Sequence, residues 1–186
     1  MGIIDSILTN SKAEDLVAFL TLSGLVYKTE QVSSRNLWIY LDDEQSENYK
    51  LWENNERAKS ISKELGCSTM WFTNLDGIWD HYLYCKGELK ERIDSYPGIY
   101  DWCGDRSDGF TEDISAEFEA RRMNIENDVT TGSAVRISQH FDLVNGDIIE
   151  LDIIMQNALH ILGPGNDYGV DELVEILGYN DRVMNI

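Results

Sequence analysis

The sequence predicts an α+β domain in which an antiparallel meander of about four strands packs with helices placed before and after it. The central block, CSTMWFTNLDGIWDHYLYCKGELKERIDS, contains Asp76-Gly77 and Lys86-Gly87, and each dipeptide separates two segments of strand-like composition. Apolar residues recur with helical spacing on both sides of this block. Because 186 residues suit one domain with its own core, we expect a single α+β sandwich of two layers over residues 1–186.

Two helices and a strand are predicted before the meander. Ser11 followed by Glu14 is a capping-box pattern, which predicts a first helix near 12–23. NLWIYLDD, residues 36–43, alternates and predicts a strand that joins the meander. The segment 53–65 has apolar residues on one side, which predicts a second helix that ends at the following glycine.

A long loop and then four helices are predicted after the meander. Residues 95–110, SYPGIYDWCGDRSDGF, hold too many glycines and aspartates for a regular element. Helical spacing of apolar residues then marks segments that begin near Ile114, Ala134, Ile148 and Val170. Asp147 with Glu150 predicts the cap of the third of these helices, and Gly178 the end of the last. The expected core stripe of the third helix consists of Ile148, Leu151, Met155, Ala158, Leu159 and Leu162.

The segment GPGNDYG, residues 163–169, invites comparison with phosphate-binding loops because glycines precede a predicted helix. It follows a helix, however, and it lacks the Gly-Lys-Ser/Thr ending of a P-loop. Asp167, Asp171 and Glu172 also place negative charge where the positive end of the helix dipole would hold a phosphate. We therefore predict a capping loop, with Asp167 as the N-cap of the last helix, and no bound nucleotide.

Charge is the strongest compositional signal. The chain carries 34 acidic and 15 basic residues, a formal net charge of -19, and neither Lys nor Arg occurs between Arg136 and Arg182. Such a surface repels nucleic-acid phosphates, favours solubility and speeds association with a basic protein. The apolar runs are too short for a signal peptide or a membrane span, so we expect a cytoplasmic protein whose partners include neither nucleic acid nor a membrane.

Reactive residues form no pattern that points to a cofactor, a metal or catalysis. Cys67, Cys85 and Cys103 lack a metal-binding spacing and are expected to be reduced, mostly buried thiols. His81 and Cys85 share one face of a strand, and a buried aromatic-rich face accounts for them better than a metal site. The sequence contains no G-x-S-x-G, H-E-x-x-H or G-x-G-x-x-G. We assign no catalytic residue and favour a non-enzymatic role, while a hydrolase that uses carboxylates with His81 or His140 stays open.

Partner binding is the role that the loop at 96–108 suggests. Aromatic residues crowd into this loop among aspartates, and aromatic anchors among charges are typical of protein–protein hot spots. The alternative is that the loop folds back and its rings complete the core. With the acidic residues around the start of the last helix, the candidate partner-binding residues are Tyr96, Tyr100, Asp101, Trp102, Asp105, Asp108, Asp167, Asp171 and Glu172.

The arrangement as a whole resembles that of small acidic bacterial cytoplasmic proteins, some of which act as immunity proteins of toxin systems. The resemblance runs from LWIYLDDEQS, through ELGCSTMWFTNLDGIWDHYLYCKGELKERIDSYPGIYDW, to ALHILGPGNDYGVDELVEILGYND, and so from about residue 36 onward. It lies in the layout and not in one diagnostic motif. It implies a protein without catalytic residues that binds a toxin, often over the active site of that toxin.

These observations predict a non-enzymatic acidic binding protein. Its most concrete form is an immunity protein or inhibitor that neutralises a basic toxin through its acidic face and aromatic loop. A nucleic-acid mimic, whose spaced carboxylates would imitate phosphates and occupy a DNA-binding protein, is the alternative. Apolar stripes interleaved among the carboxylates make this second hypothesis the weaker one.

Overall fold

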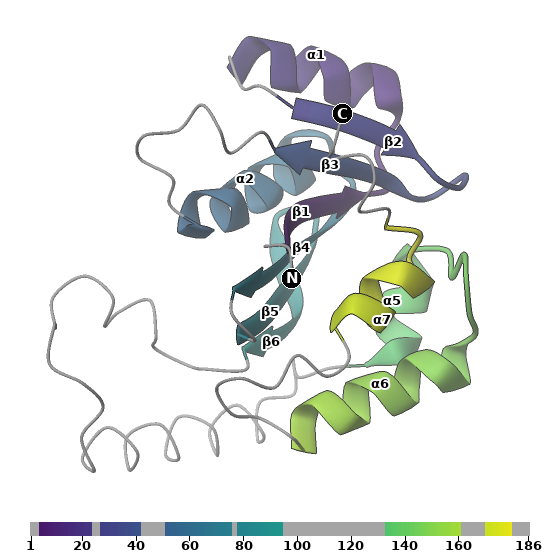
Figure 1. Ribbon diagram of the computed structural model, residues 1–186. Coiled ribbons are helices and arrows are strands. Elements are labelled where there is room, and N and C mark those ends of the chain that lie inside the picture. Colours follow the sequence, from purple (N-terminus) through teal and green to yellow (C-terminus); the bar gives the residue numbers. More distant parts are fainter. Residues whose placement is uncertain are drawn as a thin grey trace, which may run out of the picture.

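In the computed structural model, helices lie on both faces of one antiparallel sheet (Figure 1). The structure describes residues 4–23, 27–41, 51–75, 78–94, 133–160 and 170–179. The strands in this part of the chain are β1 (Ile4–Thr9), β2 (Tyr27–Gln31), β3 (Leu37–Leu41), β4 (Ser68–Leu75), β5 (Ile78–Cys85) and β6 (Glu88–Asp94). The helices are α1 (Ala13–Ser23), α2 (Leu51–Glu64), α5 (Ala134–His140), α6 (Ile148–His160) and α7 (Val170–Ile176).

Within the described residues the sheet has six strands in the order β2-β3-β1-β4-β5-β6, which confirms the α+β class but corrects the expected number of about four. The meander β4-β5-β6 is present as predicted. Its second turn holds Lys86 and Gly87 at φ 53° and 82°, the left-handed pair that a two-residue hairpin requires. The strand predicted at 36–43 joins the meander through β1, since Ser6 of β1 pairs with Tyr40 on one side and Phe72 on the other.

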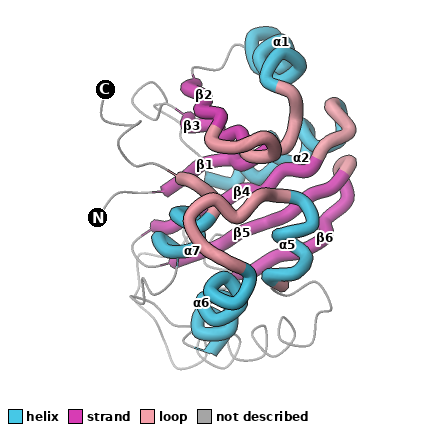
Figure 2. The backbone as a smooth tube through the Cα atoms, turned by 90° about the vertical axis from the view of Figure 1, so that its right-hand side faces the viewer, coloured by secondary structure: helices cyan, strands magenta, loops and turns pink. Residues whose placement is uncertain are grey.

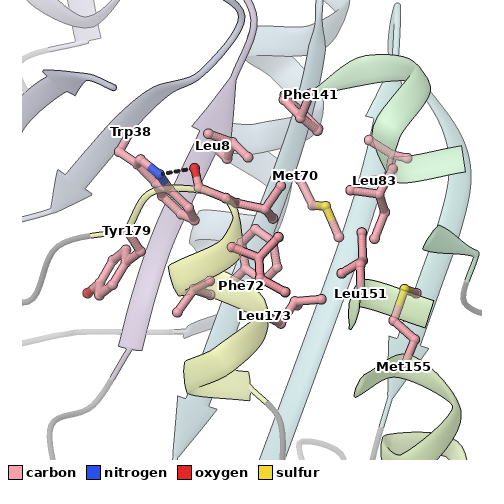
Figure 3. Packing of buried hydrophobic residues seen from close by; sticks show 14 of the residues in the cluster. Leu8, Trp38, Met70, Phe72, Leu83, Phe141, Leu151, Met155, Leu173 and Tyr179 are labelled. Atoms are coloured by element: carbon pink, nitrogen blue, oxygen red, sulfur yellow. Dashed lines mark hydrogen bonds between the residues drawn. The ribbon is translucent and has the colours of Figure 1, made fainter. Parts of the chain in front are cut away.

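Two hydrophobic cores, one on each face of the sheet, make the molecule three-layered, so the expectation of two layers is wrong. The first core joins Trp38, Met70 and Phe72 to the helices α5, α6 and α7 (Figure 3). The second core joins the opposite face, which includes Ile39 and Trp71, to α1 and α2. Adjacent strand residues point to opposite faces, so a strand that is apolar at successive positions supplies both cores. Figure 2 shows α5, α6 and α7 in front of the sheet.

The ends of the helices agree with the sequence patterns in three cases and differ in one. Asp147 Oδ1 accepts hydrogen bonds from the N–H groups of Ile149 and Glu150, and Glu150 Oε2 accepts one from the N–H of Asp147, which confirms the capping box of α6. Gly66 and Gly178 follow α2 and α7 at φ 64° and 86°, as expected of C-terminal glycines.

The helix α1 does not use the predicted capping box. The Ser11 hydroxyl oxygen is buried and makes no hydrogen bond in the structure, and the backbone N–H of Ser11 donates to Thr9 Oγ1 instead. The first intrahelical bond runs from the N–H of Leu16 to the carbonyl of Lys12. The helix therefore begins one residue later than a Ser11 cap requires.

Several predicted features lie outside the described residues. These are the Asp76-Gly77 turn, the loop at 95–110, the helix marked from Ile114, the thiol of Cys103 and the GPGNDYG segment at 163–169. In the part of the chain that is described, no helix has both the length and the apolar character needed to cross a membrane.

Candidate functional site

A groove of about 620 Å³ opens between α6 and α7. Helix α6 contributes residues spaced three and four apart, and α7 with the residues after it does the same, so each helix presents one face to the groove. The lining residues are Asn145, Glu150, Ile153, Ile154, Glu172, Glu175, Ile176 and Tyr179. Helical periodicity therefore brings an apolar floor and an acidic rim together at one place.

The helix α6 leaves several isoleucines in contact with solvent beside this groove. Ile149 is 66% exposed and Ile153 is 53% exposed, and they lie one turn apart on the helix. Ile148, which the sequence placed in the core stripe, is 40% exposed, so that assignment is wrong. Leu151 and Met155 are buried against the sheet as expected. Since α6 carries branched apolar side chains on more than one side, it can bury one face and still present apolar surface to a partner.

The charge of the groove is negative. Glu150, Glu172 and Glu175 are exposed, and no Lys, Arg or His is among the described residues that line it. The absence of any Lys or Arg between Arg136 and Arg182 means that α6 and α7 carry no basic side chain other than His160. Three carboxylates beside exposed isoleucines are suited to a ligand that is both basic and apolar.

The floor of the groove is anchored in the first core. The Tyr179 ring lies 5.1 Å from the Trp38 ring in an edge-to-face arrangement and 5.4 Å from the Tyr40 ring. Trp38 Nε1 in turn donates a hydrogen bond of 3.2 Å to the carbonyl of Leu177, at the end of α7 (Figure 3). Packed aromatic rings with a satisfied indole N–H hold this end of α7 in a fixed position on the sheet.

The segment between α5 and α6 fixes the two groove helices to one another. The N–H groups of Val144 and Asn145 donate to the carbonyl of Ile176 at 2.7 and 3.2 Å, and Asn145 Nδ2 donates to the carbonyl of Glu175 at 2.8 Å. These bonds satisfy carbonyls that the end of a helix leaves without partners. A Cβ at Gly146 would lie 2.7 Å from Glu150 Oε2 and 2.9 Å from Ile176 Cγ1, so the close approach of this segment depends on glycine.

Among the described residues, one of the partner-binding residues predicted from the sequence lines the groove. Glu172 lines it, and Asp171 belongs to the same helix, although the side chain of Asp171 is not among those described. The aromatic and acidic residues at 96–108 and Asp167 lie outside the described residues. The apolar half of the site was missed, because the sequence analysis followed only the predicted core stripe of this helix and gave Ile153 and Ile154 no role.

A second cluster of ionisable groups is buried between the sheet and α5. His81 Nε2 lies 3.2 Å from Glu91 Oε1, and both side chains are completely buried. Glu91 Oε2 accepts hydrogen bonds from the N–H of Ser133 at 2.9 Å and from Arg136 Nη1 at 3.4 Å. The cluster ties β5 and β6 to the start of α5. Because a dissolved substrate does not reach His81 in this conformation, the pair has the character of a structural contact and not of a catalytic one.

The third cluster contains His140, the other histidine considered for catalysis. Its Nδ1 lies 2.8 Å from Ser68 Oγ, and its backbone carbonyl accepts a hydrogen bond from Asn10 Nδ2. Partial burial, followed by the charge of Arg35, lowers the pKa of His140, so the imidazole is neutral at pH 7. Ser68 is only 4% exposed, and its contact with His140 joins β4 to the end of α5.

The cysteines and carboxylates show no metal site in the described residues. Cys67 and Cys85 are free thiols, half-buried where the sequence predicted mostly buried ones, and burial raises the pKa of Cys67. No group of three or more His, Cys, Asp or Glu side chains in this part of the chain is arranged to hold a metal ion. Comparison with protein-family models, curated proteins and solved structures found no match to the chain.

Proposed function

We propose that this protein is a non-enzymatic inhibitor, of the immunity-protein kind, that neutralises a basic protein by binding it at the groove between α6 and α7. The observation that carries the proposal is that the exposed Ile153 and the partly buried Ile154 line one groove together with three exposed glutamates. Apolar contacts supply binding free energy, and the carboxylates select a basic partner and speed its approach. The net charge of -19 extends this attraction beyond the groove.

The first experiment is affinity capture from the native cell with three versions of the protein. The groove variant is Glu172→Gln/Glu175→Gln, and the matched control is Glu56→Gln/Glu64→Gln on the exposed side of α2, across the sheet. Both variants change the net charge by the same amount. We expect one basic protein to be retained by the wild type and by the α2 control and to be lost from the groove variant.

The second experiment tests neutralisation with the captured partner. Expression of the partner alone is expected to stop cell growth, and co-expression with the wild type, but not with the groove variant, restores it. The association rate of the two purified proteins should fall at least about tenfold when salt is raised from about 0.05 to about 0.5 M. If all three versions capture the partner equally, the groove is not its binding site. If the partner keeps its full activity in the complex, the protein is not its inhibitor.

A further inference from the structure

We propose that the groove between α6 and α7 receives one amphipathic helix of the partner, with apolar residues on one face and Lys or Arg on its flanks. This inference rests on the proposed function and specifies the form of the ligand. The groove lies between two helices, and a third helix can pack its side chains into such a groove at an axial distance of about 8 to 10 Å. The volume of about 620 Å³ accommodates several large side chains and not a whole domain.

The backbone chemistry of the groove favours a helix over an extended peptide. Its walls are helices, whose N–H and C=O groups bond to one another. The carbonyls of Glu175 and Ile176 accept hydrogen bonds from the α5–α6 segment. An extended ligand would desolvate its own backbone without gaining backbone partners, whereas a helical ligand satisfies its backbone internally. Recognition is therefore by side chains.

The positions of the charges define the pattern expected in the ligand. Glu150 lies on the α6 wall, and Glu172 and Glu175 lie one turn apart on the α7 wall. The same walls carry apolar lining residues, Ile153 and Ile154 on α6 and Ile176 on α7. A ligand helix with apolar residues at i, i+3 or i+4, and i+7 places them on the isoleucines. Basic residues on either side of that stripe then face the glutamates. Uniform basic charge without the stripe would leave the exposed side chain of Ile153 in water.

Selection from a random peptide library tests the inference directly and does not require the native partner. Displayed peptides of about 16 residues, enough for about four helical turns, are selected on the full-length protein and sequenced. Enriched peptides are expected to show the helical stripe with basic flanks and to gain helical circular dichroism on binding. Their affinity should fall by more than about tenfold for Ile153→Ser and for Glu172→Gln/Glu175→Gln. The controls Leu22→Ser, at an exposed leucine of α1, and Glu56→Gln/Glu64→Gln should leave affinity unchanged.

Each other outcome overturns the inference. Enriched peptides that lack the stripe, contain proline within it, or bind the groove variants as tightly as the wild type identify another ligand form or another site. A library that yields no binder would show that the groove does not take a helical peptide. If the protein instead forms a dimer at high concentration and Ile153→Ser abolishes that dimer, the groove binds a second copy of this chain and not a partner helix. If the native partner is still lost from the groove variant in these cases, the proposed function stands and only the helical form of the ligand fails.

Discussion

At the scale of single residues, Glu91 joins the sheet to the helical layer through buried hydrogen bonds. It is completely buried and contacts His81, the N–H of Ser133 and Arg136. An intact buried network of charged groups contributes little net stability. Removing one member is nevertheless strongly destabilising, because the remaining buried groups lose their hydrogen-bond and charge partners.

The substitution Glu91→Gln is therefore expected to lower the free energy of unfolding by about 3 kcal/mol. Urea denaturation followed by circular dichroism measures the change. The control is Glu88→Gln, on the same strand, because the Glu88 carboxylate contacts only the exposed Lys90 in the described residues and its loss should leave the midpoint unchanged. An unchanged midpoint for Glu91→Gln would mean that solvent compensates Arg136.

His140 gives the protein a defined dependence on pH. Its pKa is lowered in the folded state, first by burial and then by Arg35, from an ordinary value of 6.5. The unfolded chain therefore binds a proton at pH values where the folded one does not, and protonation favours unfolding. The stability contributed by the neutral imidazole is complete above about pH 6.5 and is lost as the pH falls through that value toward the lower folded pKa.

We expect His140→Asn to show a smaller loss of unfolding free energy between about pH 7.5 and about pH 5 than the wild type. Asparagine keeps a polar group within reach of Ser68 and removes the proton-binding site. Urea titrations at several pH values measure the two slopes. Parallel slopes for wild type and variant would show that His140 titrates alike in the folded and unfolded chains.

At the scale of elements, Asn36 fastens the β2–β3 hairpin to the ends of α5 and α7. Its Nδ2 donates to the carbonyls of Asp142 and Leu177 at 2.8 and 2.9 Å, and its Oδ1 accepts from the N–H of Asp142 at 2.8 Å. The side chain is completely buried. Removing it would take away the side-chain partner of both the N–H and the carbonyl of Asp142, whereas the Leu177 carbonyl would keep its hydrogen bond from Trp38 Nε1.

Asn36→Ala is accordingly expected to lower the free energy of unfolding by about 2 to 4 kcal/mol and to speed amide hydrogen exchange at Asp142. Asn145→Ala, which removes a single hydrogen bond at an exposed position, should cost less than about 1 kcal/mol. Comparable losses in the two variants would count against a special role of the Asn36 contacts.

The elements also show what the sequence could and could not predict. The meander, the capping box of α6 and the glycine ends of α2 and α7 rest on local residue patterns, and the structure confirms them. The strand β1 was missed because both of its faces are buried, so Ser6, Ile7, Leu8 and Thr9 do not alternate between polar and apolar. The strand β2, YKTEQ, was missed because it is a polar strand at the edge of the sheet.

The candidate site was predictable in its charge and not in its apolar part. Glu172 follows from the acidity of the last helix. Which of the isoleucines at 148, 149, 153 and 154 face the sheet depends on how α6 is rotated about its axis. That rotation is set by tertiary packing against β4 and β5 and by the segment around Gly146, and periodicity alone does not determine it.

At the scale of the whole molecule, the two cores share the strands β1, β3, β4 and β5, so we expect them to unfold together. Trp38 reports on the first core and Trp71 on the second. With fluorinated tryptophan, the folded ¹⁹F resonances of both residues should disappear at the same urea concentration. Separate midpoints would divide the chain into two units and contradict the prediction of one domain.

The central place of β1 also has a consequence for the order of events during synthesis. β1 leaves the ribosome before either of the strands that flank it, and β4 follows only after β3 and α2 have been made. Until then one edge of β1 carries unpaired backbone groups, a state that favours contacts between nascent chains. Because these pairings join distant parts of the chain, closure of the sheet around β1 is expected to limit the folding rate. Slower translation between residues 42 and 67 would lengthen that exposure, whereas a chaperone bound to the first strand would shorten it.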